Sequence, residues 1–353
     1  MTAFTNHSID LMERIAADTD NIPQMTRRGY AVATRNQDID GLIEQLYTGY
    51  GEGSRDLIRF HNGASAQWYP APESADWQSA PDGVDVIQGN ERVRQVFPWL
   101  SDEITSVVHI RRAGDISVQQ LGQYMLERIR ACGGRLKRAR VTGVQVENGF
   151  RLELTGSRTT EYIRAEQWVN AAGPFAKDIA KMIAVDLPVR NLLEQKIAFE
   201  DRAAAIPRQM PFSIDLDARG LDWQPEEREL LAADDELAWL VEPMPGGLHC
   251  RPDVGECGTW VKIGWVYNQE FTQPVWEPAF DAHFPEIVLR RAAALVPALQ
   301  AYEGSLPPHY SHYGGYYSMT DENWPLIGPL GVEGAFVVGA LSGFGTMAAC
   351  TAG

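Results

Sequence analysis

The spacing of apolar positions along the chain predicts a mixed α/β protein. Apolar residues that recur every three or four positions indicate amphipathic helices, and short apolar or alternating runs indicate strands. Helices are expected around 8–16, 39–49, 118–129 and 286–300, and strands at 29–34, 84–87, 135–147, 150–154, 167–170 and 335–339. Between 236 and 268 the pattern becomes strand, turn, strand, turn, strand, which predicts an antiparallel sheet. The chain therefore combines two architectures and is α+β overall.

Two segments read as a strand, a glycine-containing turn and a helix, at residues 169–176 and 336–349. Glycine lets the backbone come close to a ligand, and the free N–H groups at a helix N-terminus can face an anion or a polar carbonyl. Ordinary turns between strands and helices also contain glycine, so the spacing alone leaves both interpretations open. A third group, Gly49, Gly51 and Gly53, follows no apolar strand and predicts only a helix end and loop.

The charge balance narrows the classes of partner. The 353 residues include 47 acidic and 31 basic side chains, a net charge of −16. A surface this negative repels phosphate backbones and anionic lipid heads, so neither nucleic acid nor a membrane surface is an expected partner. No stretch of about 18 apolar residues occurs and the opening residues do not resemble a secretory signal, so we expect no membrane span and a cytoplasmic location.

Four cysteines are too few for a disulfide scaffold. Two of them, Cys250 and Cys257, lie near His249 and are a possible metal-binding set. A fourth ligand at usable spacing is missing, and the same segment reads as a hairpin. We therefore expect no metal site.

Four sequence blocks, taken together and in order, resemble the D-amino acid oxidase and sarcosine oxidase-like flavoproteins. The first is Gly-Asp-Ile-Ser at 114–117, followed by a helix, and the second is Val-Asn-Ala-Ala-Gly-Pro at 169–174. The third joins Tyr-Ser-Met-Thr-Asp at 317–321 to Pro-Leu-Ile-Gly at 325–328, and the fourth is Leu-Ser-Gly-Phe-Gly at 341–345. Each block is weak alone, whereas four in register are fairly specific.

The resemblance implies an FAD-binding Rossmann-like domain interleaved with a substrate domain built on a large antiparallel sheet. The FAD part would comprise 1–28, 111–185 and 314–353, and the substrate part 29–110 and 186–313. Family members open with a strand and a GxGxxG turn, and their last helix is longer than the run of small residues at 346–353. We therefore expect the FAD domain to be incomplete and the chain to be a fragment.

Site residues follow from the same resemblance, position by position. Val141 would face adenine. The ribityl-diphosphate side would be formed by Ala171, Ala172 and Gly173, and the flavin N1–C2=O edge would receive N–H groups from Gly343, Phe344, Gly345, Thr346 and Met347. Gly314 stands where some members carry the cysteine that attaches flavin covalently, so non-covalent FAD is expected.

Lys262 is the strongest catalytic candidate. The segment Trp260–Trp265 resembles the strand of sarcosine oxidases whose lysine lies near flavin N5 and assists the reaction with oxygen. Strand alternation puts Lys262 on the face opposite Val261 and Ile263. The alternative is a lysine on a solvated sheet face.

Substrate contacts are expected from Arg251 and Tyr316. The lysine that holds a carboxylate in sarcosine oxidases aligns with Met347, so another anchor is needed, and the guanidinium of Arg251 suits a carboxylate. The alternative, which the residues alone favour slightly, is an arginine on a surface hairpin. Tyr316 aligns with a tyrosine near the substrate, although the tyrosines at 310–317 also suit simple packing.

The implied activity is FAD-dependent oxidation of a C–N bond of an amine or amino acid to an imine, by hydride transfer to flavin N5. Oxygen or an electron carrier would take the electrons. The alternative is a truncated, non-catalytic fragment that does not bind FAD on its own. A nicotinamide-dependent dehydrogenase is disfavoured because the chain has no GxGxxG fingerprint.

Overall fold

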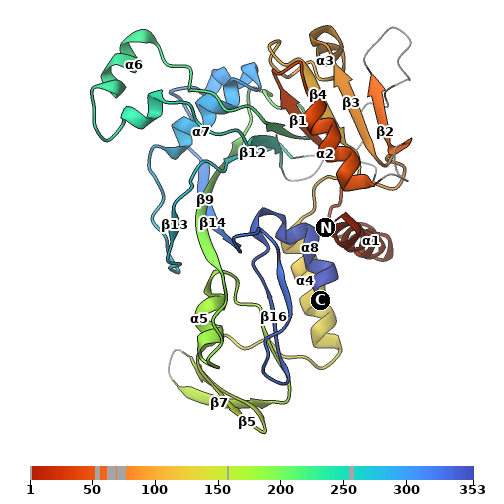
Figure 1. Ribbon diagram of the computed structural model, residues 1–353, viewed down its shortest axis with the longest axis vertical. Coiled ribbons are helices and arrows are strands. Elements are labelled where there is room, and N and C mark those ends of the chain that lie inside the picture. Colours follow the sequence, from red (N-terminus) through yellow and green to blue (C-terminus); the bar gives the residue numbers. More distant parts are fainter. Residues whose placement is uncertain (1, 52–55, 62–68, 70–76, 157–158, 254–257) are drawn as a thin grey trace.

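Two long strands, β9 (Arg190–Glu200) and β14 (Tyr310–Met319), pair antiparallel over their whole length and connect the upper and lower parts of the molecule (Figure 1). Because both strands run from one part into the other, β9 and β14 set how the two parts sit relative to each other.

The computed structural model describes residues 2–51, 56–61, 69, 77–156, 159–253 and 258–353.

The upper part is a large sheet with the strand order β13-β9-β12-β11-β10-β1-β4-β3-β2, to which β14 is added through β9. The remaining members are β1 (Tyr30–Thr34), β2 (Ile58–His61), β3 (Val84–Gln88), β4 (Ser106–Ile110), β10 (Phe212–Asp215), β11 (Leu248–Pro252), β12 (Trp260–Trp265) and β13 (Phe271–Thr272). The expected large sheet is confirmed. It is mostly antiparallel, but β1 with β10 and β2 with β3 are parallel pairs, so it is mixed.

The two faces of the large sheet are covered differently. One face packs on α7 (Phe284–Ala293) and α3 (Asn90–Val96) through a continuous apolar core. At the β2–β4 end the other face packs on α2 (Asp40–Tyr50). Farther along, over β11, β12 and β9, that second face carries polar and charged side chains instead. It is this open stretch that can hold a site.

The segment before β11 corrects one sequence prediction. The first strand expected after residue 236 is a 3-10 helix, Ala238–Val241, packed beside α6 (Pro225–Ala232). Pro243 and Pro245 lack backbone N–H groups and so disfavour a strand here. The carbonyl of Leu240 accepts a hydrogen bond from the Trp223 indole at 2.9 Å, rather than from a neighbouring strand.

The lower part contains two small sheets. β16 (Ala335–Gly339) lies between β15 (Leu326–Pro329) and β8 (Trp168–Asn170), and β16 and β8 are parallel. The second sheet is the meander β5 (Arg140–Glu147), β6 (Gly149–Thr155) and β7 (Thr160–Ala165). Phe150 of the meander and Trp168 of β8 meet in one apolar cluster, so the two sheets pack together.

Helices α1 (Thr2–Asp18), α4 (Val118–Ala131), α5 (Ala176–Lys181) and α8 (Gly345–Ala352) complete the lower half. α1 and α8 lie side by side, and the hydroxyl of Thr351 donates to the carbonyl of Phe4 at 3.1 Å (Figure 1). α1 starts at Thr2, six residues before the start that the sequence pattern predicts. Among the described residues, no helix is both long and apolar enough to cross a bilayer. The interleaved domain division stays a proposal, and its boundary at 313/314 falls inside β14.

A buried ion network fastens α7 to the ends of β1 and β10. Arg291 and Asp215 have fully buried side chains, and Nη1 of Arg291 lies 2.6 Å from Oδ2 of Asp215. Nη1 of Arg35 reaches the same carboxylate at 3.1 Å. Removing Arg291 takes from the buried Asp215 carboxylate the fully buried one of its two guanidinium partners, which is strongly destabilising in a low-dielectric interior.

We therefore predict that Arg291→Met lowers the free energy of unfolding by about 3–5 kcal/mol, as measured by urea titration. The control is Arg202→Met, because Arg202 forms an exposed pair with Glu200 and exposed pairs contribute at most about 1 kcal/mol. Equal losses in the two variants would contradict this view of the network.

Candidate functional site

The open face of the large sheet gathers basic and aromatic side chains from several strands. In the β12 register, Lys262 lies between Arg251 of β11 and Ala198 of β9, and Gly264 lies between His249 and Lys196. Because side chains alternate along a strand, Lys262 shares its face with Arg251 and Lys196, while Ile263 points into the core. The strand register thus places Lys262 on the face opposite Val261 and Ile263, as the sequence pattern predicts.

Two carboxylates join the predicted residues Lys262 and Arg251. Nε of Arg251 lies 3.0 Å from Oδ1 of Asp115, and Nη1 of Arg251 lies 3.0 Å from Oδ1 of Asp253. Nζ of Lys262 lies 3.3 Å from Oδ2 of Asp253. Burial lowers the pKa of Lys262, and the neighbouring charge of Arg251 lowers it further, against the pull of Asp253. Arg251 is thus no free surface arginine, because two carboxylates hold it in place.

The sequence pattern did not predict a role at the site for Asp115 or Asp253. Asp115 lies inside the block at 114–117 that carries the family resemblance, so its position could have signalled a role. Gly114 holds this loop close to the backbone of Thr26, where an added Cβ would collide with the Thr26 carbonyl. The backbone N–H of Thr26 donates to the carbonyl of Asp115 at 2.9 Å. The close contact anchors the carboxylate that faces Arg251.

Tyr316, the predicted substrate contact, and its neighbour Tyr317 point in opposite directions. Tyr316 pairs with Leu193, on the face away from Lys262, and its hydroxyl accepts the backbone N–H of Val275 at 3.0 Å. Tyr317 pairs with Leu192, so it lies on the same face as Lys196 and Lys262. Alternation along the strands would separate Tyr316 from Tyr317 only if the pairing of β14 with β9 and of β9 with β12 were known, and the sequence alone does not give these registers. The structure brings Tyr317, rather than Tyr316, to the charged face.

Tyr317 also contacts the glycine-rich turn before α8. A Cβ added to Gly343 would lie 2.9 Å from the Tyr317 ring, so only glycine packs there without displacing the ring. Burial raises the pKa of Tyr30 to about 12, with Asp115 and Tyr317 adding to the effect. The turn and the charged face are therefore parts of one neighbourhood.

The two predicted strand–turn–helix segments open at the same edge of the small sheet. Because β8 and β16 are parallel, the turns that follow them lie together, as in dinucleotide-binding folds. Gly173 has a φ of +56° and nothing lies within 4 Å of its added Cβ. The side chain of Asn191, on β9, donates to the Pro174 carbonyl at 3.2 Å and so ties this turn to the large sheet.

The predicted cofactor residues fit a flavin. Ala171, Ala172 and Gly173 are small, and the first turn of α8 presents backbone N–H groups from Gly345, Thr346 and Met347. Ala340 and Ser342 adopt positive φ values of 53° and 49°, which non-glycine residues keep only where the surroundings enforce them. The N–H of Phe344 already donates to Leu341, at 3.1 Å.

Val141 lies elsewhere in the lower part. It is half-buried on β5 and packs against the Phe150–Trp168 cluster. It therefore sits beside the sheet that carries both turns.

The possible metal set is not assembled. His249 and Cys250 are adjacent on β11 and point to opposite faces, with Cys250 in the core. Burial raises the pKa of the Cys250 thiol to about 12, which disfavours the thiolate that metals need. Cys257 lies outside the described residues. Within the described part of the chain, no group of three or more His, Cys, Asp or Glu side chains suits a metal ion.

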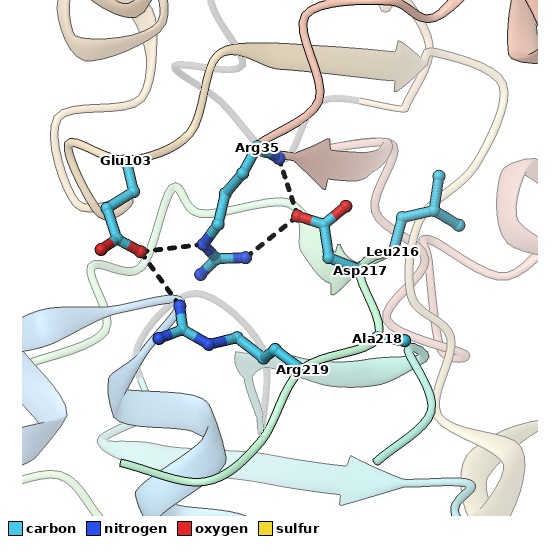
Figure 2. Close-up of a pocket in the computed structure, with 6 residues that line it drawn as sticks. All are labelled: Arg35, Glu103, Leu216, Asp217, Ala218 and Arg219. Carbon is cyan, nitrogen blue, oxygen red and sulfur yellow. Dashed lines mark hydrogen bonds and ion pairs between the residues drawn. The ribbon is translucent and has the colours of Figure 1, made fainter. Parts of the chain in front are cut away.

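A separate open pocket of about 770 Å³ is lined by Arg35, Glu103, Leu216, Asp217, Ala218 and Arg219 (Figure 2). Figure 2 shows Glu103 bridging Arg35 and Arg219, at 3.0 Å to each. Arg35 also pairs with Asp217 at 3.2 Å. Since its charged groups satisfy one another and continue into the buried Arg291–Asp215 pair, we interpret this pocket as part of the structural network.

One known protein is similar in sequence to part of this chain. Human mitochondrial dimethylglycine dehydrogenase is 23% identical over 223 residues, which are 58% of this chain and 25% of that protein. The chain thus spans about a quarter of that relative's length.

Two solved structures share the fold. Glycine oxidase from Geobacillus kaustophilus superposes with a TM-score of 0.68 at 15% identity, over 99% of this chain and 76% of that one. L-proline dehydrogenase from P. horikoshii gives a TM-score of 0.65 at 14% identity, over 99% and 76% of the two chains.

The family model that describes FAD-dependent oxidoreductases, named DAO, matches residues 1–353, the whole of this chain. The paired turns at the edge of the small sheet and the charged face of the large sheet are thus features of a chain that belongs to the DAO family of FAD-dependent oxidoreductases.

Proposed function

We propose that this chain carries the site at which an amine or amino acid is oxidised at a C–N bond to an imine, with FAD as a non-covalent cofactor. The observation that carries the proposal is the contact of Gly343 with Tyr317, because it joins the flavin-type turn to the sheet face that bears Lys262. A cofactor at the turn and a substrate on the face would then be neighbours.

The proposed cofactor residues divide by chemistry. Ala171, Ala172 and Gly173 leave room for the ribityl-diphosphate, and Val141 would contact adenine. Gly343, Phe344, Gly345, Thr346 and Met347 would present the positive end of α8 to the flavin N1–C2=O edge, where negative charge develops on reduction. When bound, FAD supplies the two-electron oxidation by accepting a hydride at N5.

The charged face would favour the reactive form of the substrate. Arg251, Lys262 and Lys196 are partly desolvated cations, and nearby positive charge disfavours a protonated amine. A substrate amine placed among them would be neutral, which is the form that can lose a hydride. Arg251 would hold Asp115 and Asp253 in position, and Tyr316 would fix the segment at Val275 behind the sheet.

Lys262 would act on the acceptor side of the reaction. Its ammonium group is held by Asp253, and it lies 6.0 Å from the centroid of the Tyr313 ring. A fixed cation beside the flavin stabilises negative charge that develops on oxygen. This favours oxygen as acceptor, with an electron carrier as the second candidate.

One prediction of the proposed function concerns cofactor binding. We expect the purified chain, mixed with FAD and desalted, to retain visible flavin absorption. Gly343→Ala should weaken FAD binding about tenfold, because the new Cβ displaces the Tyr317 ring and shifts the turn. Gly122→Ala, in α4 with nothing within 4 Å of its Cβ, is the matched control. A colourless wild-type protein would favour the alternative of a fragment that does not bind FAD on its own.

The second prediction concerns Lys262. In flavin-loaded protein, Lys262→Met should slow oxygen consumption by the reduced enzyme on the order of 100-fold, while substrate-dependent bleaching slows much less. Because burial lowers the pKa of Lys262, the wild-type oxygen rate should fall as the pH rises, beginning below the range of a free lysine. Lys181→Met, at an exposed position, serves as the control. Equal slowing of both steps would remove Lys262 from the acceptor side.

A further inference from the structure

The paired strands β9 and β14 contact one of the two glycine-containing turns on each of their faces. On the charged face, the ring of Tyr317 packs against Gly343 in the turn before α8. Asn191 lies diagonally across the ladder from Tyr317 and therefore, by strand alternation, on the opposite face. There its Nδ2 atom donates to the carbonyl of Pro174, in the turn after β8, at 3.2 Å. One short stretch of the ladder thus holds both turns.

The amide group of Asn191 is fixed in one orientation. Asn191 and Ser318 are both buried, and the hydroxyl of Ser318 donates to Oδ1 of Asn191 at 2.7 Å. The carbonyl of Pro174 can only accept a hydrogen bond, so the amide must turn its Nδ2 atom toward it. Ser318 therefore orients the group that holds the turn after β8.

The turn after β8 is also braced internally. The side chain of Asn170 donates to the carbonyl of Ala176 at 2.8 Å and accepts the backbone N–H of Ala172 at 3.3 Å. These bonds begin and end within one segment, so they define its shape. The bond from Asn191 comes from a different sheet, so it defines where that segment lies.

An aromatic stack reports the position of this turn. The ring of Phe175, the residue after Pro174, stacks on Trp276 with ring centroids 4.8 Å apart and an interplanar angle of 22°. Trp276 is 72% exposed, so the stack removes little apolar area from water and holds the turn only weakly. A displacement of the turn would move one ring relative to the other.

We propose that Asn191 is a positioning residue, which holds the turn after β8 so that FAD bound along it also meets the N–H groups at the turn before α8. The assignment rests on the proposed function for the identity of the cofactor. Reduction places negative charge on the flavin N1–C2=O edge, and hydrogen bonds to that edge weaken steeply when their distance or angle changes. Asn191 thereby favours the reduced cofactor over the oxidised one, acting through the turn.

The first test measures the midpoint potential of the bound flavin and the affinity for FAD, in the full chain. Asn191→Ala should lower the equilibrium constant for flavin reduction about tenfold, which is about 30 mV for a two-electron couple. The dissociation constant of oxidised FAD should change less than about threefold, because the turn keeps its internal bonds. An unchanged potential overturns the proposal.

Asn268→Ala is the matched control for this measurement. The Asn268 side chain also donates to a carbonyl of β9, that of Leu193, at 3.1 Å. It makes this bond away from both turns, so its loss should leave the potential and the FAD affinity unchanged. An equal fall of the potential in both variants overturns the role of Asn191.

Ser318 supplies a second pair of variants. Ser318→Ala removes the hydroxyl that orients the amide, so the potential should shift in the same direction as in Asn191→Ala. Ser318→Thr keeps a hydroxyl and should retain the wild-type potential. Equal losses in the two Ser318 variants overturn the proposal, because packing would then account for them. If Asn191→Ala does not fold, this pair decides.

The second test needs no cofactor. A chain labelled with 5-fluorotryptophan contains ten fluorinated side chains, and Trp276→Phe identifies the ¹⁹F signal of Trp276. Asn191→Ala should shift this signal, because the ring of Phe175 moves with the turn, whereas Asn268→Ala should not. Unmoved signals from the other tryptophans show that the variant is folded. A Trp276 signal that stays in place overturns the proposal.

The two measurements separate this proposal from the proposed function. Retained FAD and amine oxidation, with an unchanged potential in Asn191→Ala, refute only the role of Asn191. A Trp276 shift in a chain that binds no FAD refutes the proposed function and leaves Asn191 as the residue that places the turn.

Discussion

The pairing of β9 with β14 is the constraint on which the candidate site depends. Its register places Lys196 beside Tyr313, and Leu192 beside Tyr317, so the basic face of the large sheet and the ring that packs on Gly343 lie along one pair of strands. Asn191 at the end of the same pair holds the turn after β8. A slip of one residue would turn Lys196 into the core and Tyr317 away from the turn. The ladder therefore determines whether the glycine-rich turn and the charged face lie side by side.

The sequence predicted the local elements and the family, and it failed where long-range register decides. Alternation within residues 260–265 is a local property, so the face of Lys262 was predictable. The opposite orientations of Tyr316 and Tyr317, and the meeting of Asp115 with Arg251, depend on strands far apart in the chain. Lys196 carried no motif at all. The strand expected near residue 238 failed for a local reason, since Pro243 and Pro245 lie just beyond it.

The overall charge of this protein does not describe the charge distribution at its candidate site. The chain carries a net charge of −16, yet the open face of its large sheet brings together Arg251, Lys262 and Lys196. Asp115 and Asp253 balance part of this positive charge. Net charge describes the average surface and its long-range repulsion, whereas a site responds to the groups within a few ångströms and to their desolvation. An acidic protein can thus contain a local cluster of cations whose effect its net charge does not reveal.

The fully buried pair of Arg291 and Asp215 has a consequence for how this sequence can diverge. A change of Asp215 alone leaves the buried Arg291 without its counter-ion, and a change of Arg291 alone leaves Asp215 with Arg35 as its remaining guanidinium partner. Evolutionary drift at one position is therefore disfavoured while the other is kept. A joint exchange for apolar residues of similar volume faces no such barrier, and it can even stabilise a fold. Among homologous sequences, these two positions should therefore change together or not at all.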